Sequence, residues 1–219
     1  QMTLNKFINN YNKGEKKHLI SHKTRTGKSI TQLLIIKWLL NNNKKVLFMT
    51  SVPSTILNFI KDLEEYITFK DIEYYRLQAN NEEELFIDIN SLSLCSIQFL
   101  KNDVNGNKKE FLKKQMYDVM LIDECHYGSS NNKTKNNIID VDKNIEDIRK
   151  RTPISIFSSG TSMKTQKFYR IKNSCIYEWN LYDESQMKLL HNDNYENNEI
   201  INNMILRHGN IFNDVINDY

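Results

Sequence analysis

Two short runs of apolar residues limit what this chain can fold into. They are KVLFMT at residues 45–50 and YDVMLID at residues 117–123, which is apolar until it ends in acids. Strands that are apolar throughout are typical of parallel sheets with helices on both faces. Further strand candidates lie at residues 17–21, 72–77, 94–100, 152–161 and 175–181. They alternate with helices that begin near Ile30, Pro53 and Ile145, so we expect an α/β fold with a central, mostly parallel sheet flanked by helices.

A phosphate-binding loop is indicated directly after the first strand candidate. HKTRTGKS, residues 22–29, matches the end of the Walker A form G-x-x-x-x-G-K-[ST], with His22 in place of the first glycine. Gly27 allows the backbone to approach a phosphate, Lys28 can reach the β- and γ-phosphates, and the Ser29 hydroxyl can ligate Mg²⁺. The helix that follows supplies N–H donors and a positive dipole. Taken alone, a G-K-S triplet in a Lys-rich chain is equally compatible with chance.

An acidic pair ends the most apolar strand candidate. Asp123 can hold Mg²⁺ directly or through water, and Glu124 beside it can polarise an attacking water. An arbitrary Asp-Glu pair more often starts a surface loop. Parallel sheets, however, place ligands at the carboxyl ends of their strands, and the GKS loop, this pair and residues 159–161 all follow strand candidates. Their coincidence favours a nucleotide site.

The motifs, in this order, resemble the first motor domain of superfamily 2 helicases and translocases, the DEAD/DEAH-like proteins with a RecA-like P-loop NTPase core. TRTGKS resembles motif I, DECH resembles motif II, and SSGT at residues 158–161 resembles motif III. TSVPS at residues 50–54 is similar to motif Ia, and CSIQFL at residues 95–100 to motif Ib. The resemblance covers residues 1–181. Within the superfamily it is nearest to the motor subunits of type I and type III restriction enzymes and related phage or viral proteins.

The resemblance implies a role for each matching residue. The nucleotide would be held by Thr24, Arg25, Thr26, Gly27, Lys28 and Ser29. The catalytic residues would be Lys28, Asp123 and Glu124, with Ser29 and Asp123 on Mg²⁺ and Glu124 orienting the water. Coupling of the nucleotide state to the nucleic-acid groove would fall to His126, Ser159, Gly160 and Thr161. Contacts to the nucleic-acid backbone would come from Pro53, Ser54, Ser96 and Gln98.

Some positions depart from the pattern of that superfamily. His22 and Arg25 replace residues that are often small, and Arg25 either adds charge at the phosphates or points to solvent. Cys125 stands where alanine is common and is interpreted as a small packing residue. Motors of this kind bind ATP between two RecA-like domains, and the second supplies arginines. After Thr161 the chain offers only Arg170 and Arg207.

The extent of the resemblance and this shortage of arginines together suggest a domain organisation. We expect a helicase ATP-binding domain at residues 1–190, and at residues 191–219 a helical tail or the start of a linker. A second RecA-like domain is expected in cis beyond Tyr219 or in trans on a partner chain. The sequence is therefore interpreted as an excerpt or a truncated gene product, with weak or no ATP turnover as a single lobe.

Composition adds few constraints. Thirty basic and 27 acidic residues give a net charge of +3, which neither demands nor excludes a polyanionic partner. Three cysteines without a C-x-x-C pair fit a reducing, intracellular setting, meaning the cytoplasm, or a viral factory or virion if the protein is viral. No apolar run approaches the roughly 20 residues that cross a bilayer, so no membrane partner is expected.

The sequence thus predicts the N-terminal ATPase lobe of a helicase or translocase that hydrolyses ATP with Mg²⁺ to move on DNA, with RNA less favoured. A nuclease or methylase partner is compatible with the restriction-type resemblance. The alternative is a nucleic-acid- or partner-binding module that keeps the fold without ATP turnover. A P-loop kinase is disfavoured by the ordered DECH and SGT motifs.

Overall fold

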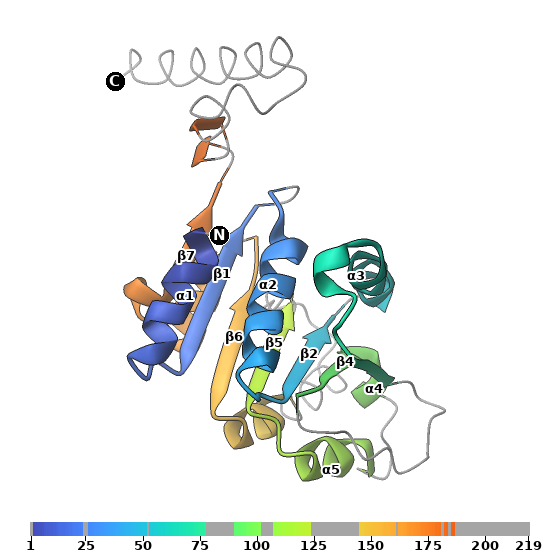
Figure 1. Ribbon diagram of the computed structural model, residues 1–219. Helices are drawn as coiled ribbons and strands as arrows, with labels where there is room; N and C mark the ends of the chain where they lie inside the picture. Colours follow the sequence, from blue (N-terminus) through green and yellow to red (C-terminus); the bar gives the residue numbers. More distant parts are fainter. Residues whose placement is uncertain are drawn as a thin grey trace. The chain divides into compact units, whose positions relative to one another are not determined.

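The computed structural model describes residues 2–23, 26–51, 53–77, 90–101, 107–123, 145–160, 162–180, 182–183 and 185–186 (Figure 1). By their contacts, Gln1–Glu178 form one compact unit and Trp179–Tyr219 a second. The expected boundary at residue 190 and the expected helix at residues 191–219 lie outside the described residues. The fold below is that of the first unit and of the strand that ends at Trp179.

A seven-stranded sheet forms the centre of the fold, in the order β3-β4-β2-β5-β6-β1-β7. The strands are β1 (Lys17–His22), β2 (Val46–Thr50), β3 (Tyr74–Leu77), β4 (Leu92–Ser96), β5 (Val119–Asp123), β6 (Ile154–Ser158) and β7 (Ile176–Trp179). The pairs β3–β4, β4–β2, β2–β5, β5–β6 and β6–β1 are all parallel. The predicted α/β fold with a parallel central sheet is confirmed.

Helices cover both faces of the sheet because alternate strand residues point to opposite sides. Val46 and Phe48 pack in one core cluster with α1 (Met2–Asn12), α2 (Lys28–Asn41) and α3 (Pro53–Glu65). Leu47 and Met49 pack in a second cluster with α4 (Ile97–Lys101), α5 (Asn107–Lys114) and the helical residues 145–151. Figure 1 shows α1, α2 and α3 side by side over one face. The central strands are therefore apolar on both faces, as their sequences predicted.

The remaining elements are short. They are the helix α7 (Ser162–Tyr169) and the 3₁₀ turns η1 (Ile67–Phe69) and η3 (Asn173–Cys175).

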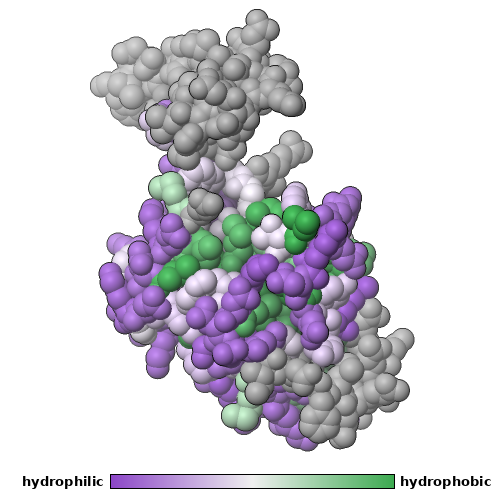
Figure 2. All heavy atoms as spheres, viewed as in Figure 1, coloured by the Kyte–Doolittle hydropathy of each residue, from purple (hydrophilic) through white to green (hydrophobic). Residues whose placement is uncertain are grey.

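On the face covered by α2, Ile30 and Leu34 are only partly buried. Figure 2 shows apolar side chains gathered there between polar ones.

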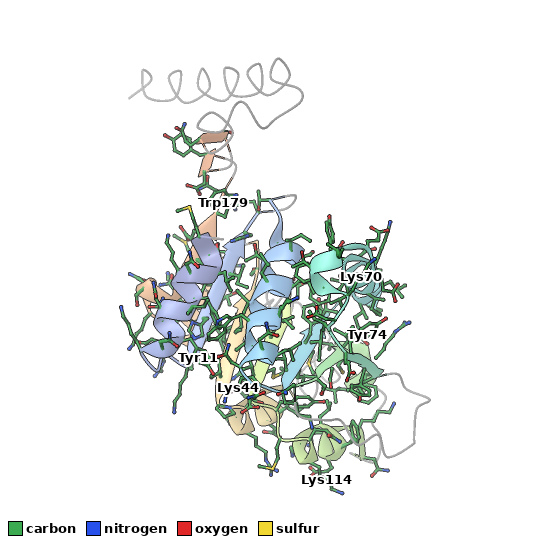
Figure 3. The ribbon with its side chains drawn as sticks, in the orientation of Figure 1. Tyr11, Lys44, Lys70, Tyr74, Lys114 and Trp179 are labelled. Carbon is green, nitrogen blue, oxygen red and sulfur yellow. The ribbon has the colours of Figure 1, made fainter. Side chains whose placement is uncertain are left out.

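Two elements differ from the sequence predictions. The strand expected at residues 94–100 ends at Ser96, and α4 begins at Ile97. The helix α1 was not anticipated, although Leu4, Phe7 and Ile8 have helical spacing. Tyr11 on α1, labelled in Figure 3, packs its ring 5.1 Å from that of Trp38 on α2. The first helix is thus part of the core and covers the sheet beside α2.

Candidate nucleotide-binding site

The carboxyl ends of five strands form one level row. In the sheet register, Ser158 pairs with both Ile20 and Asp123, and Thr50 pairs with both Asp123 and Ser96. The strands β4, β2, β5 and β6 end at these positions, and β1 ends two residues after Ile20. The segments that the sequence singled out follow these strand ends. Parallel α/β sheets bind ligands along this edge.

The loop between β1 and α2 has the backbone of a phosphate-binding turn. Gly27 immediately precedes α2 and has φ 78° and ψ 26°, a left-handed conformation that favours glycine. A Cβ at Gly27 would meet no atom within 4 Å, so the space beside it is open. The Thr26 hydroxyl donates to the Lys23 carbonyl over 2.7 Å, which fixes the turn. Thr24 and Arg25, also expected to bind nucleotide, lie outside the described residues.

The first turn of α2 supplies the positive end of the site. Its N-cap residue, Gly27, makes no side-chain capping hydrogen bond, and the backbone N–H groups at the start of a helix are donors that suit an anion. Lys28 and Ser29 are the first two residues of the helix, and both are partly exposed. Backbone donors, an ammonium and a hydroxyl therefore meet at one helix end, as the Walker A resemblance implied.

Lys28 and Asp123 form an ion pair across the site. Lys28 Nζ lies 3.2 Å from Asp123 Oδ1, and the Asp123 side chain is only 2% exposed. Asp123 is the last residue of β5, the strand two places from β1 in the sheet. The structure thus brings together the two residues on which the nucleotide-site hypothesis most depends.

A third side chain joins this pair that the sequence analysis missed. Gln32 Nε2 donates to Asp123 Oδ1 over 2.7 Å and to Ser158 Oγ over 2.8 Å. Gln32 follows Lys28 by four residues, so both side chains lie on one face of α2. A signal was present, since Gln32 is a polar residue inside the apolar sequence ITQLLII.

His22, which stands at the place of the first Walker glycine, is the last residue of β1 and not part of the turn. It is 3% exposed, and its Nε2 lies 3.2 Å from the Thr3 hydroxyl of α1. Its Nδ1 is buried and has no hydrogen-bond partner within the described part of the chain. Burial lowers the His22 pKa to about 4, and the charge of Lys28 acts in the same direction. A neutral imidazole behind the loop leaves the Gly-Lys-Ser end intact.

The end of β6, the strand that lies between β1 and β5, contacts the loop. Lys23 Nζ donates to the Gly160 carbonyl over 3.2 Å. Ser159 is fully buried, and its N–H donates to the Ile20 carbonyl over 3.1 Å. Residues 159 and 160, expected to couple nucleotide to nucleic acid, therefore contact the strand and the loop of the phosphate site. Thr161, Glu124 and His126 lie outside the described residues.

The residues expected to contact nucleic acid follow β2 and β4. Pro53 and Ser54 are exposed at the start of α3, and Ser96 is half-buried at the end of β4. Gln98 belongs to α4. All four lie at or just after the carboxyl ends of β2 and β4, two strands on the side of β5 that faces away from β1.

The donor set fits Mg²⁺ bound together with phosphate. Mg²⁺ is commonly held by one or two carboxylates and by oxygens of the substrate, without a cage of protein ligands. Asp123 supplies a carboxylate and Ser29 a hydroxyl, and the described residues contain no cluster of three or more His, Cys, Asp or Glu side chains that could enclose a metal.

No helix in the described ranges is long and apolar enough to cross a membrane.

A RecA-like sheet with this loop and this carboxylate at its carboxyl edge defines the class of P-loop NTPase domains, and the family match makes the chain a helicase-like nucleic-acid motor ATPase domain. More particularly, it belongs to the family described as "Type III restriction enzyme, res subunit", whose model matches residues 1–151. The predicted resemblance to restriction-type motors is confirmed.

One curated relative is from Mycoplasma pneumoniae and is described as the C-terminus of a type II restriction enzyme and methyltransferase. It is 27% identical over an alignment of 141 residues, and the match covers 58% of this chain and 19% of the relative. The Sulfolobus solfataricus SWI2/SNF2 ATPase core in complex with double-stranded DNA is similar in structure, with a TM-score of 0.51 and 14% identity over 71% of this chain and 29% of that one. The UvsW helicase of bacteriophage T4 gives a TM-score of 0.47 and 17% identity over 67% and 47% of the two chains. The chain thus spans about a fifth of the curated relative it matches.

Proposed function

We propose that this chain is the first motor lobe of an ATP-dependent translocase or helicase that acts on DNA. The observation that carries the proposal is the ion pair between Lys28, at the start of α2, and Asp123, at the end of β5. A lysine at a helix N-terminus and a carboxylate at the end of another parallel strand of the same sheet are the two charges that a nucleotide triphosphate with Mg²⁺ requires. The family assignment supports the same function.

The residues of the loop would bind and orient the nucleotide. The N–H groups after Gly27 and the Lys28 ammonium would hold the β- and γ-phosphates, with Thr24, Arg25 and Thr26 lining the same loop. Ser29 and Asp123 would hold Mg²⁺, which when bound neutralises charge on the phosphate oxygens. Glu124 would orient the water for attack on the γ-phosphorus.

Without nucleotide, the Lys28–Asp123 pair keeps two opposite charges neutralised in a largely buried place. Arrival of a triphosphate with Mg²⁺ would give each partner a new counter-charge, since the phosphates are anionic and the metal is cationic. Nucleotide and metal are therefore expected to bind together more tightly than either does alone.

The nucleic-acid path is proposed along the ends of β2 and β4. Pro53, Ser54, Ser96 and Gln98 would contact the phosphodiester backbone. His126, Ser159, Gly160 and Thr161 would report the nucleotide state to that path, and the Lys23–Gly160 contact supports this route. A second RecA-like domain would complete the ATP site, and a nuclease or methylase partner fits the relative's description.

The proposal is tested by titrating Mg·ATP into the 219-residue chain and into two variants. Lys28→Ala should abolish binding, whereas Lys37→Ala, in the same helix but paired with Asp71, should bind like the wild type. In the complete motor with both lobes, Glu124→Gln should retain binding and stop hydrolysis. Unchanged binding by Lys28→Ala would refute the nucleotide site.

A separate titration addresses the polymer. Duplex and single-stranded DNA are added to the same chain in the presence and absence of Mg·ATP, and binding is followed by fluorescence anisotropy. DNA affinity without any nucleotide affinity would favour the binding-module alternative over the motor.

A further inference from the structure

Gln32 occupies a place where an unpartnered polar group would be costly. It is 1% exposed, and the residues around it in α2, Leu33, Ile35 and Ile36, are fully buried in the apolar core. A buried amide without hydrogen bonds destabilises a protein by roughly 1–3 kcal/mol. Its two contacts, to Asp123 and Ser158, satisfy both hydrogens of the amide nitrogen.

The chemistry of the partners fixes the orientation of this amide. An ionised carboxylate can only accept hydrogen bonds, so the Gln32 nitrogen and not its oxygen must face Asp123. The bond is charge-assisted and, at 2.7 Å, short for a donor nitrogen. Gln32 therefore restrains the carboxylate plane of Asp123, the side chain proposed to hold Mg²⁺.

Lys28 and Gln32 share the same oxygen of Asp123. Lys28 Nζ lies 3.2 Å from Oδ1, and Gln32 Nε2 lies 2.7 Å from it. When Lys28 moves to a phosphate, Gln32 remains as a donor that keeps Asp123 in place. A carboxylate already oriented needs less ordering when the metal arrives.

The second bond of Gln32 leads to β6. Ser158 is the last residue of that strand and pairs with Asp123 in the sheet register. The chain continues from Ser158 directly into Ser159 and Gly160, which contact β1 and Lys23. A displacement of the end of β6 would therefore act on the Gln32 amide and, through it, on Asp123.

We propose that Gln32 is a positioning residue, which orients the Mg²⁺ carboxylate Asp123 and links it to the end of β6 through Ser158. The inference rests on the proposed function. Residues that hydrogen-bond to metal ligands typically contribute 10- to 100-fold to metal affinity. The contribution of Gln32 should therefore appear in nucleotide binding with metal and be absent without it.

The test is calorimetric titration of the 219-residue chain with ADP, once with excess Mg²⁺ and once with EDTA. Gln32→Met keeps the length of the side chain and removes both donors. It should weaken Mg·ADP binding by about 10-fold and change metal-free ADP binding by less than about 2-fold. Gln166→Met, on α7, where Gln166 contacts Asn173, is the matched control and should change neither affinity.

Ser158→Ala provides a second, milder variant in case Gln32→Met does not fold. Thermal melting checks that each variant is folded. Ser158→Ala should weaken Mg·ADP binding, relative to metal-free ADP binding, by about 2- to 5-fold. In this variant Gln32 keeps its hydrogen bond to Asp123 but loses its link to β6. Equal weakening with and without Mg²⁺ would show a merely structural role and overturn the inference. Wild-type affinities for both Gln32→Met and Ser158→Ala would also overturn it. A wild-type chain that binds ADP under neither condition would instead refute the proposed nucleotide site.

Discussion

Lys28 and Asp123 face each other across the carboxyl edge of the sheet, with Nζ 3.2 Å from Oδ1 and side chains 18% and 2% exposed. Two opposite charges so shielded from water depend on each other, because removal of one leaves the other buried without a counter-charge. The pair therefore contributes to the stability of the nucleotide-free chain as well as to its chemistry.

A double-mutant cycle measures this dependence. Lys28→Met and Asp123→Asn, singly and combined, should show a coupling free energy of about 1–3 kcal/mol in urea unfolding without nucleotide. The exposed pair Lys61–Glu65, with side chains 68% and 59% exposed, is the control and should couple by about 0.5 kcal/mol or less. Equal coupling free energies in the two pairs would contradict the shielding of the Lys28–Asp123 pair from water.

The conformation of Gly27 allows a prediction with a matched control. Gly27 and Gly14 have φ of 78° and 80°, and neither has an atom within 4 Å of the place of a Cβ. Alanine at either position should cost about 1–2 kcal/mol of stability, because only the backbone is strained. Only Gly27→Ala should also weaken Mg·ADP binding, since its Cβ would lie beside the phosphates. Equal ADP affinity of the two variants would exclude close approach of nucleotide to Gly27.

The sequence predicted the strands, and it placed the GKS loop and the acidic pair at one edge of the sheet, because both predictions follow from local signals. A continuous apolar run identifies a buried strand, and parallel strands bring their carboxyl ends to one edge. The register that sets Ser158 level with Asp123 is a tertiary feature, and it decides that Gln32 reaches both. No pattern along the chain contains that information.

Two other differences have physical causes. CSIQFL is apolar enough for a strand, but the sheet pairing ends at Ser96 and the chain turns into α4, where Phe99 and Leu100 are still buried.

His22 was expected at the first position of the phosphate loop. It lies instead inside the end of β1, because α1 covers it and Thr3 contacts its ring. An unanticipated helix thus changed the interpretation of a motif residue.

That first helix is held to the far edge of the sheet by a buried network. His18 Nε2 lies 3.0 Å from the Glu15 carbonyl, so Nε2 carries the proton and Nδ1 accepts from the Tyr177 hydroxyl over 2.8 Å. Asn10 of α1 donates to the same hydroxyl. Tyr177→Phe should therefore cost about 1–2 kcal/mol in urea unfolding without changing Mg·ADP affinity. Tyr66→Phe, half-exposed, should stay within about 0.5 kcal/mol, and a similar loss there would argue against the network.

The two buried histidines predict how stability depends on pH. Burial lowers the pKa of His18 and of His22 from 6.5 to about 4 in the folded chain. Between about pH 4 and pH 6.5 the unfolded chain binds more protons than the folded chain, so the free energy of unfolding rises with pH. Stability should be full above about pH 6.5 and should fall by about 2 kcal/mol per histidine by pH 5, as measured by urea unfolding. His18→Gln and His22→Gln remove one titrating group each, so each should reduce the slope by about half. An unchanged slope in both variants would assign the pH dependence to other groups.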